Sequence, residues 1–205
     1  TSVALAQFLD DIRLDGYAPP AEIRSDQGSE FYVPQTNTPA GRPVPLSKFS
    51  RLCLKHSIRH RVAPPYNSTL NGMVERAHRS LHEAANAYLY DSGLSPVFWC
   101  MAVKHAEYVK NRIPHSALGL RTTPYQVVHL RRPRYDRIKV FGCDMFEFMR
   151  LKRKIPGAAK ARKLIYIGVP TNGDTGYLGF DIKTRTILVA YDVTFDEDFA
   201  NRRTE

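Results

Sequence analysis

The sequence of 205 residues lacks any apolar run near the roughly 18 residues that a membrane span needs. Its first residues also lack the basic and apolar regions of a signal peptide. It has only three cysteines, Cys53, Cys100 and Cys143, an odd and widely spaced set that argues against a disulfide framework or a cysteine-based zinc site. We therefore expect no membrane partner and a reducing compartment. Because the chain begins with Thr1 and not with Met, we also expect a fragment of a longer protein.

Acidic residues are scarce in one part of the chain. The whole sequence has 30 Lys and Arg against 20 Asp and Glu, a net charge of +10. Residues 121–163 hold 13 basic and 3 acidic groups, whereas 1–120 hold 13 and 10, and 164–205 hold 4 and 7. A localised positive charge attracts a polyanion and binds its phosphates without sequence choice. The alternative is a solvated basic face or linker.

Apolar spacing predicts a folded α/β arrangement in the first half of the chain, and 43% of the sequence is hydrophobic. The pattern predicts helices over 2–15 and 46–56 and a long helix ending near 92, with short strands over 21–25 and 58–62. Four prolines within 33–45 predict an exposed loop, because proline interrupts helices and interior strands.

The second half begins with helical patterns and changes character near residue 138. Helices are expected from Pro96 to near Asn111 and after Pro124, since proline suits the first turn of a helix. Short branched or aromatic segments then predict strands at 140–142, 164–168, 177–180 and 187–189. We expect a small, separate β module behind a basic connector that includes Lys152, Arg153 and Lys154.

Two acidic residues occupy positions that could hold a metal ion. Asp26 is expected at the C-terminal end of a strand, and Glu75 in the first turn of the long helix. A strand end and a helix start on one sheet can bring two carboxylates together, and hard oxygen ligands suit Mg²⁺ or Mn²⁺. The alternative is structural, because Asp favours turns and Glu favours the positive end of a helix.

The same helix carries a polar stripe after Glu75. His78, Arg79 and His82 follow at i+3, i+4 and i+7 and offer donors for phosphate oxygens. An ordinary i,i+4 pair between Glu75 and Arg79 on a solvated face explains the stripe equally well.

Several ordered motifs resemble the integrase of copia-type LTR retrotransposons. They are Ser25-Asp-Gln-Gly-Ser-Glu-Phe31, Ala63-Pro-Pro-Tyr66, Asn71-Gly-Met-Val-Glu-Arg76, Arg79-Ser-Leu81, Phe98-Trp99, Asn111-Arg-Ile-Pro114, Thr123-Pro-Tyr125 and Val140-Phe-Gly-Cys143. The closing residues from Gly176-Tyr177 to Glu197 also resemble that family's β module. The match spans nearly the whole chain.

The resemblance implies an α/β fold: an RNase H-like integrase core lacking its N-terminal strands, followed by a small SH3-like β module. It implies a partial catalytic core at 1–115, a basic connector at 116–163 and the β module at 164–205, for which 138 is an alternative start. It further implies a D,D,E polynucleotidyl transferase that performs 3′-end processing and strand transfer on the element's DNA ends and target DNA. A homo-oligomer in the nucleus or a virus-like particle is implied as well.

In that family's site, Asp26 matches the second Asp and Glu75 matches the Glu, and together they would hold Mg²⁺ or Mn²⁺ as catalytic and metal-binding residues. We assign DNA binding to seven residues: Asn71, His78, Arg79, His82, Lys152, Arg153 and Lys154.

Three features depart from the family pattern. Only 25 residues precede Asp26, and the aspartates among them lie in the predicted helix and not on a strand. We therefore expect the first catalytic Asp to be missing and the isolated chain to be inactive. The 48 residues between Asp26 and Glu75 include the proline-rich loop as an insertion. Ser68 and Thr69 stand where Pro and Gln are usual. Two other functions therefore stay open: a non-catalytic nucleic-acid-binding module from a decayed or repurposed integrase, and a structural oligomerisation fragment.

Overall fold

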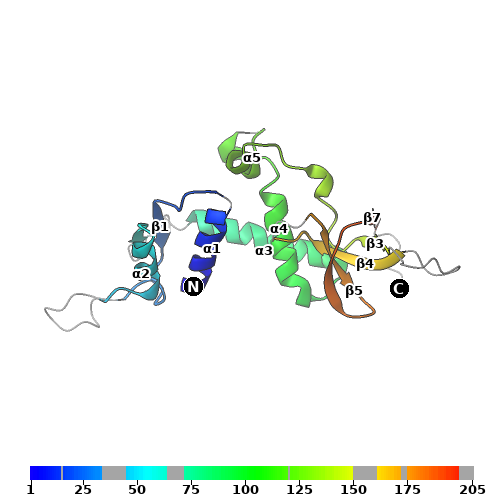
Figure 1. Ribbon diagram of the computed structural model, residues 1–205, viewed down its shortest axis with the longest axis horizontal. Helices are drawn as coiled ribbons and strands as arrows, with labels where there is room; N and C mark the ends of the chain where they lie inside the picture. The colour runs from blue at the N-terminus through cyan, green and yellow to red at the C-terminus, as the bar shows by residue number, and fades with distance from the viewer. Residues whose placement is uncertain are drawn as a thin grey trace. The chain divides into compact units, whose positions relative to one another are not determined.

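A computed structural model describes residues 1–14, 16–33, 45–63, 72–119, 121–149, 161–171 and 175–198 (Figure 1). The chain divides into two compact units, 1–77 and 78–205. The boundaries expected from sequence, at 115 and 163, do not coincide with this division and stay predictions about which segments fold independently. Of the helices in the described ranges, none combines the length and apolarity required to cross a membrane.

The first unit contains a β-α-β motif preceded by a helix. Its elements are α1 (Ser2–Leu14), β1 (Glu22–Ser25), α2 (Lys48–Lys55) and β2 (Arg59–Val62). Ser47 is the N-cap of α2, and its side chain accepts a hydrogen bond from the backbone N–H of Ser50. This bond satisfies one of the N–H groups that a helix leaves unpaired at its start.

The strands β1 and β2 run parallel, in a register that pairs Glu22 with Arg59 and Ser25 with Val62. Two parallel strands must be joined by a crossover connection, and α2 is part of the connection between β1 and β2. Side chains from both helices and from the segment after α2 form the core: Leu5, Leu9, Phe49, Cys53 and Ile58, with Ile12, Ile23, Phe31 and Leu52 against them. These elements match the helices and strands predicted for this part of the sequence. The loop predicted at 33–45 falls almost entirely outside the described residues.

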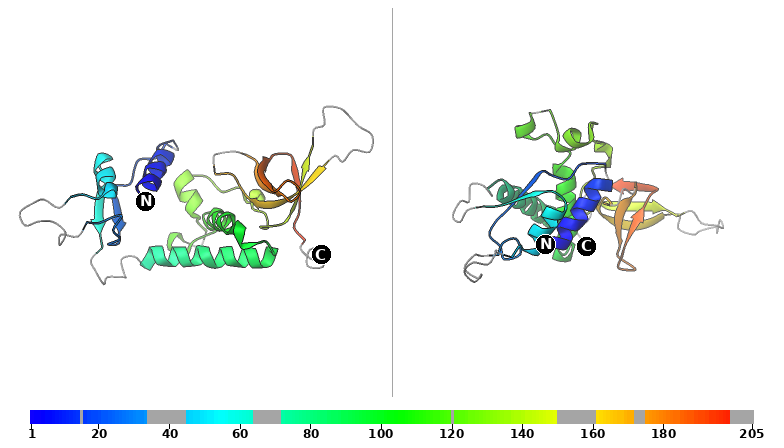
Figure 2. Two further views of the ribbon diagram at one scale, coloured as in Figure 1. Left: turned by 90° about the horizontal axis from the view of Figure 1, so that it is seen from below. Right: turned by 60° about the vertical axis from the view of Figure 1, so that its left-hand side comes forward.

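The second unit is formed by the rest of the chain, and the long helix α3 (Gly72–Ser92) spans the boundary between the units. A 3-10 turn at Pro96–Phe98 leads into α4 (Trp99–Lys110), which crosses α3 (Figures 1 and 2). After a 3-10 turn at Ser116–Leu118, α5 (Pro124–His129) follows. Thr123 caps α5 by accepting from the backbone N–H of Gln126 at 3.1 Å, and Pro124 occupies the first turn as predicted.

The C-terminal part forms a five-stranded antiparallel sheet in the order β6-β5-β4-β3-β7. After a 3-10 turn at Tyr135–Arg137, its strands are β3 (Asp144–Phe148), β4 (Ala161–Gly168), β5 (Tyr177–Asp181), β6 (Thr186–Ala190) and β7 (Val193–Asp196). The strand predicted at 140–142 is wrong. Phe141 and Gly142 lie in a turn, where Gly142 has a φ of 79°, and the strand starts at Asp144.

The sheet shares a hydrophobic core with the helices, and its folding as a separate module stays a prediction. Ala85 and Leu89 from α3 and Ala102 from α4 pack with Phe141, Ile165 and Ile167. The opposite face of the sheet has its own core of Cys143, Met145, Leu164, Tyr166 and Ala190. Burial on both faces explains why residues 164–167 of β4 form a continuous apolar run.

Candidate functional site

Asp26 directly follows β1, at the edge where the C-terminal ends of both parallel strands lie. Its side chain is exposed, and Oδ1 accepts a hydrogen bond from the backbone N–H of Gly28 at 3.1 Å. A Cβ on residue 28 would stand 3.1 Å from that oxygen and 2.9 Å from Oε2 of Glu30. Glycine at position 28 therefore leaves room for the carboxylates of Asp26 and Glu30 beside the turn. Ligands of α/β folds bind at open sheet edges of this kind.

A hydrogen-bonded chain through His60 supports the end of β1. Nε2 of His60 lies 2.8 Å from the Ser25 hydroxyl, and Nδ1 lies 2.9 Å from the Ser50 hydroxyl. The Ser25 hydroxyl also donates to the backbone carbonyl of Asp26 at 3.0 Å. Since the Ser25 hydroxyl proton is engaged, a neutral His60 can donate from Nε2 to that oxygen and accept at Nδ1 from the Ser50 hydroxyl. The Phe31 carbonyl, 3.3 Å away, is a second acceptor for the Ser50 hydroxyl. Burial lowers the pKa of His60, which favours this neutral form.

The two strands also carry a cluster of arginines around one acid. Glu22 lies 2.9 Å from Arg24 and 2.8 Å from Arg61, and 3.9 Å from Arg59. The Arg24 hydrogen bond and the neighbouring guanidinium charges lower the pKa of Glu22 although burial opposes them. Three cations share one carboxylate here, so this face of the sheet is positively charged.

Glu75 lies in the first turn of α3 and is exposed, as are His78, Arg79 and His82. Among the described residues, no ion pair joins Glu75 to Arg79, so the ordinary i,i+4 pair is not present. The rings of His78 and His82 are stacked with centroids 6.3 Å apart, and His82 meets Trp99 edge-on at 5.2 Å. The polar stripe is thus a continuous exposed row with one end against α4.

Other predicted site residues lie outside the described ranges. These are Asn71, Lys152, Arg153 and Lys154, whose assignment to DNA binding stays a prediction. Within the described ranges, no group of three or more His, Cys, Asp or Glu side chains is placed to hold a metal ion. The metal-binding role of Asp26 and Glu75 likewise stays a prediction.

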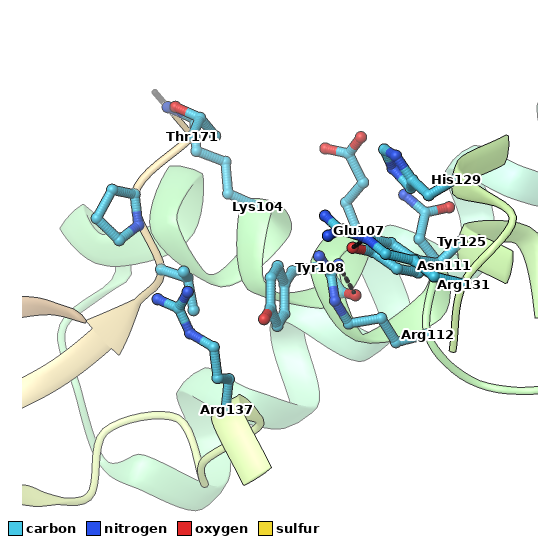
Figure 3. Close-up of a pocket in the computed structure, with 12 residues that line it drawn as sticks. Lys104, Glu107, Tyr108, Asn111, Arg112, Tyr125, His129, Arg131, Arg137 and Thr171 are labelled. Carbon is cyan, nitrogen blue, oxygen red and sulfur yellow. Dashed lines mark hydrogen bonds between the residues drawn. The ribbon is translucent and has the colours of Figure 1, made fainter. Parts of the chain in front are cut away.

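A basic pocket that sequence reasoning missed lies in the second unit, between α4, the α5 segment and the residues after β4 (Figure 3). Its volume is about 420 Å³. The lining includes four cations, Lys104, Arg112, Arg131 and Arg137, and one acid, Glu107.

Tyrosine rings interleave with these cations. The Arg112 guanidinium lies 3.5 Å from the ring centroid of Tyr108 and 4.6 Å from that of Tyr125. It also donates to the Tyr108 carbonyl at 3.0 Å, and Arg131 donates from Nε to the Tyr125 hydroxyl at 3.2 Å. The sequence contains the motifs Asn111-Arg112 and Pro124-Tyr125, but only the fold shows that Arg112 and Tyr125 are in contact.

The chain is similar to three retrovirus-related Pol polyproteins of plant transposons. Those of RE1 and RE2 from Arabidopsis thaliana are 29% identical over 144 and 143 residues, 70% of this chain in each case. That of TNT 1-94 from Nicotiana tabacum is 29% identical over 175 residues, 85% of this chain. The matched part covers 10–12% of the length of these relatives. They confirm the predicted resemblance to a retrotransposon-encoded protein.

No family model matches the chain. One solved structure that aligns with it belongs to the simian T-cell lymphotropic virus intasome in complex with PP2A regulatory subunit B56 gamma. The alignment covers 98% of this chain and 66% of the other, with 20% identity and a TM-score of 0.46. This similarity is too low to establish a shared fold.

Proposed function

From the similarity to retrotransposon Pol polyproteins, we propose that this chain is part of an integrase that joins DNA ends by metal-dependent phosphoryl transfer. The single observation behind the proposal is the order of motifs around Asp26 and Glu75 within a sequence that resembles these polyproteins over at least 70% of its length. The activity, substrates and partners of the whole protein are part of the same proposal.

In this proposal, residues of the first unit belong to an RNase H-like core. The parallel β1–β2 pair and the intervening α2 are compatible with a larger α/β sheet, because such a pair must be extended or covered to be stable. The five-stranded antiparallel sheet would correspond to the SH3-like module, although it packs closely against α3 and α4.

The donor chemistry at Asp26 and Glu75 suits a divalent metal ion. Both side chains are exposed carboxylates, and the described contact of Asp26 is one backbone N–H, which leaves lone pairs for a cation. Mg²⁺ or Mn²⁺, when bound, would activate the attacking hydroxyl and stabilise the leaving oxygen of an in-line displacement. The His60 chain would fix the backbone at Asp26, and Arg79 would attract the phosphate of the strand.

The test is strand transfer by the full-length protein carrying Glu75→Gln. This change removes a metal ligand with almost no change in volume, so we expect activity to fall at least about 10³-fold with unchanged thermal stability. Glu83→Gln is the matched control, since Glu83 is another exposed glutamate on α3. Near-normal activity of the Glu75 variant would refute the proposed role.

A second function is favoured by the charge distribution. Because residues 121–163 carry a net charge of +10, a decayed or repurposed copy would still bind nucleic acid without performing chemistry. Salt-dependent DNA binding by a full-length protein that shows no Mg²⁺-dependent strand transfer would support this alternative. Action as a homo-oligomer in the nucleus or a virus-like particle belongs to the integrase proposal.

A further inference from the structure

We infer that the basic pocket of the second unit binds an unpaired nucleotide of a nucleic-acid strand, with the two phosphates that flank it on Lys104 and Arg131 and its base beside Tyr108 and Tyr125. This site is distinct from the carboxylates at Asp26 and Glu75. The inference rests on the proposed function only for the identity of the polymer.

The charge of the pocket favours an anion. Lys104 makes no ion pair with another described residue, and Arg131 is exposed with one neutral hydrogen-bond partner, the Tyr125 hydroxyl. Arg137 donates from one terminal nitrogen to the carbonyls of Thr175 and Gly176, while its Nε is buried and has no hydrogen-bond acceptor within the described ranges. A phosphate oxygen is the acceptor that such guanidinium groups bind most strongly.

The aromatic residues favour a nucleotide over a plain anion. Tyr108 and Tyr125 are half-buried, and the guanidinium of Arg112 lies over both rings. The Tyr125 ring also packs against His129, with centroids 4.2 Å apart, so Tyr108 offers the more open ring. Figure 3 shows Tyr108 in the middle of the pocket, with Tyr125 and Arg131 on the α5 side. Rings held this rigidly lose little entropy when a base packs on them, and base–aromatic stacking is largely independent of sequence.

The size of the pocket selects an unpaired nucleotide. A volume of about 420 Å³ is at the low end of the range for small-molecule sites and fits one nucleotide, not a section of duplex. In a duplex the bases are stacked inside, so only the phosphates would reach the cations. An acidic peptide would offer carboxylates but no flat ring for the tyrosines.

The location can be tested by crosslinking in the full-length protein. An oligonucleotide carrying one 5-bromouracil in an unpaired overhang is irradiated with the protein in EDTA. We expect crosslinks on the tryptic peptides that contain Tyr108 or Tyr125, and their loss when the same base is paired in a duplex. Crosslinks confined to other peptides would overturn the inference, as would equal crosslinking of paired and unpaired bases.

Affinity for the same overhang tests the cations. Each lost contact with a single-strand phosphate lowers the salt slope by about 0.7, so the loss of two contacts lowers it by about 1.4. The double variant Lys104→Ala/Arg131→Ala should therefore bind the overhang about 25-fold more weakly at ~0.1 M salt. The matched control is Lys55→Ala/Lys183→Ala, which removes two exposed lysines that do not line the pocket. Equal losses for both double variants, or the same loss for a blunt duplex, would overturn the inference.

The two proposals fail separately. Binding in EDTA requires no metal ion, so it should survive Glu75→Gln even if strand transfer is lost. Conversely, strand transfer that depends on Glu75 would leave the integrase proposal standing when the pocket variants bind the overhang normally.

Discussion

His105 makes the stability of the second unit sensitive to acid. This side chain on α4 is only 3% exposed and is surrounded by the rings of Tyr88, Phe141 and Tyr166, with centroids 5.2, 5.5 and 5.7 Å away. Its Nδ1 is buried without a hydrogen-bond partner in the described part of the chain. Burial lowers the pKa of His105 to about 4, because an imidazolium would lose its hydration.

The size of the effect follows from the difference between the folded pKa and the ordinary value of 6.5. Because its pKa is lowered, His105 stays neutral in the folded state, while the unfolded state takes up a proton below about pH 6.5. The contribution of His105 to the unfolding free energy is therefore complete above pH 6.5 and is lost as the pH falls towards 4. The full loss is about 3 kcal/mol, of which about 2 kcal/mol falls between pH 7 and pH 5. Few exposed carboxylates titrate in that interval, which helps to isolate the histidine.

The assay is urea unfolding at pH 7 and pH 5, followed by the emission of Trp99, the one tryptophan of the sequence. We expect His105→Leu to remove about 2 kcal/mol of the pH dependence and to leave stability at pH 7 equal or higher, since an unpaired buried nitrogen is lost. His115→Asn, at an exposed position, should retain the wild-type dependence. Parallel losses of stability in wild type and His105→Leu would refute the reasoning.

Two further predictions concern local structure. Ser47→Ala should lower the unfolding free energy of the first unit by about 1–2 kcal/mol in urea titrations, because Ser47 both caps α2 and donates to the Phe31 carbonyl at 2.8 Å. A loss below about 0.3 kcal/mol would contradict this account of the cap. Gly142→Ala should destabilise the second unit by more than about 2 kcal/mol, since φ is 79° and the new Cβ would stand 2.4 Å from Cβ of Ser92. Gly93→Ala, at a φ of 67° with open space, is the control and should cost only about 1 kcal/mol; equal melting temperatures would disprove the clash.

The elements of the first half could be predicted because their signals are local. The periodic apolar residues of α1, α2 and α3 and the alternation in β1 and β2 each fall within one segment, and glycine or proline lies close to many of their ends. Asp26 was placed correctly at a strand end for the same reason.

The strand β3 was missed because its burial depends on distant partners. Its sequence, Asp144–Phe148, does not alternate regularly, because its two acids are separated by two apolar residues. These acids are matched by basic residues of the neighbouring strand β4. Lys163 lies 2.9 Å from Asp144, and Arg162 pairs with Glu147. The sequence prediction placed Arg162 and Lys163 in the basic connector. In the structure they belong to β4, and the acids of β3 neutralise their charge within the sheet.

The pocket could not be predicted for a similar reason. Its lining joins residues from 104 to 171 that are spread over helices, turns and the end of a strand. No periodicity links Arg112 to Tyr125, and their contact results from the turn that lets the Tyr125 N–H donate to the Asn111 carbonyl at 2.8 Å. Long-range contacts of this kind follow from topology, which spacing alone does not encode.

The central claim is that Asp26 and Glu75 hold the same metal ions, and Fe²⁺-directed cleavage of the full-length protein tests it most directly. Fe²⁺ takes the place of Mg²⁺ and, with ascorbate and peroxide, cuts the backbone near its ligands. The account predicts cuts next to both residues 26 and 75, lost together in Glu75→Gln and retained in Glu83→Gln. Cuts at only one of the two positions, or cuts that persist in the Glu75 variant, would contradict it.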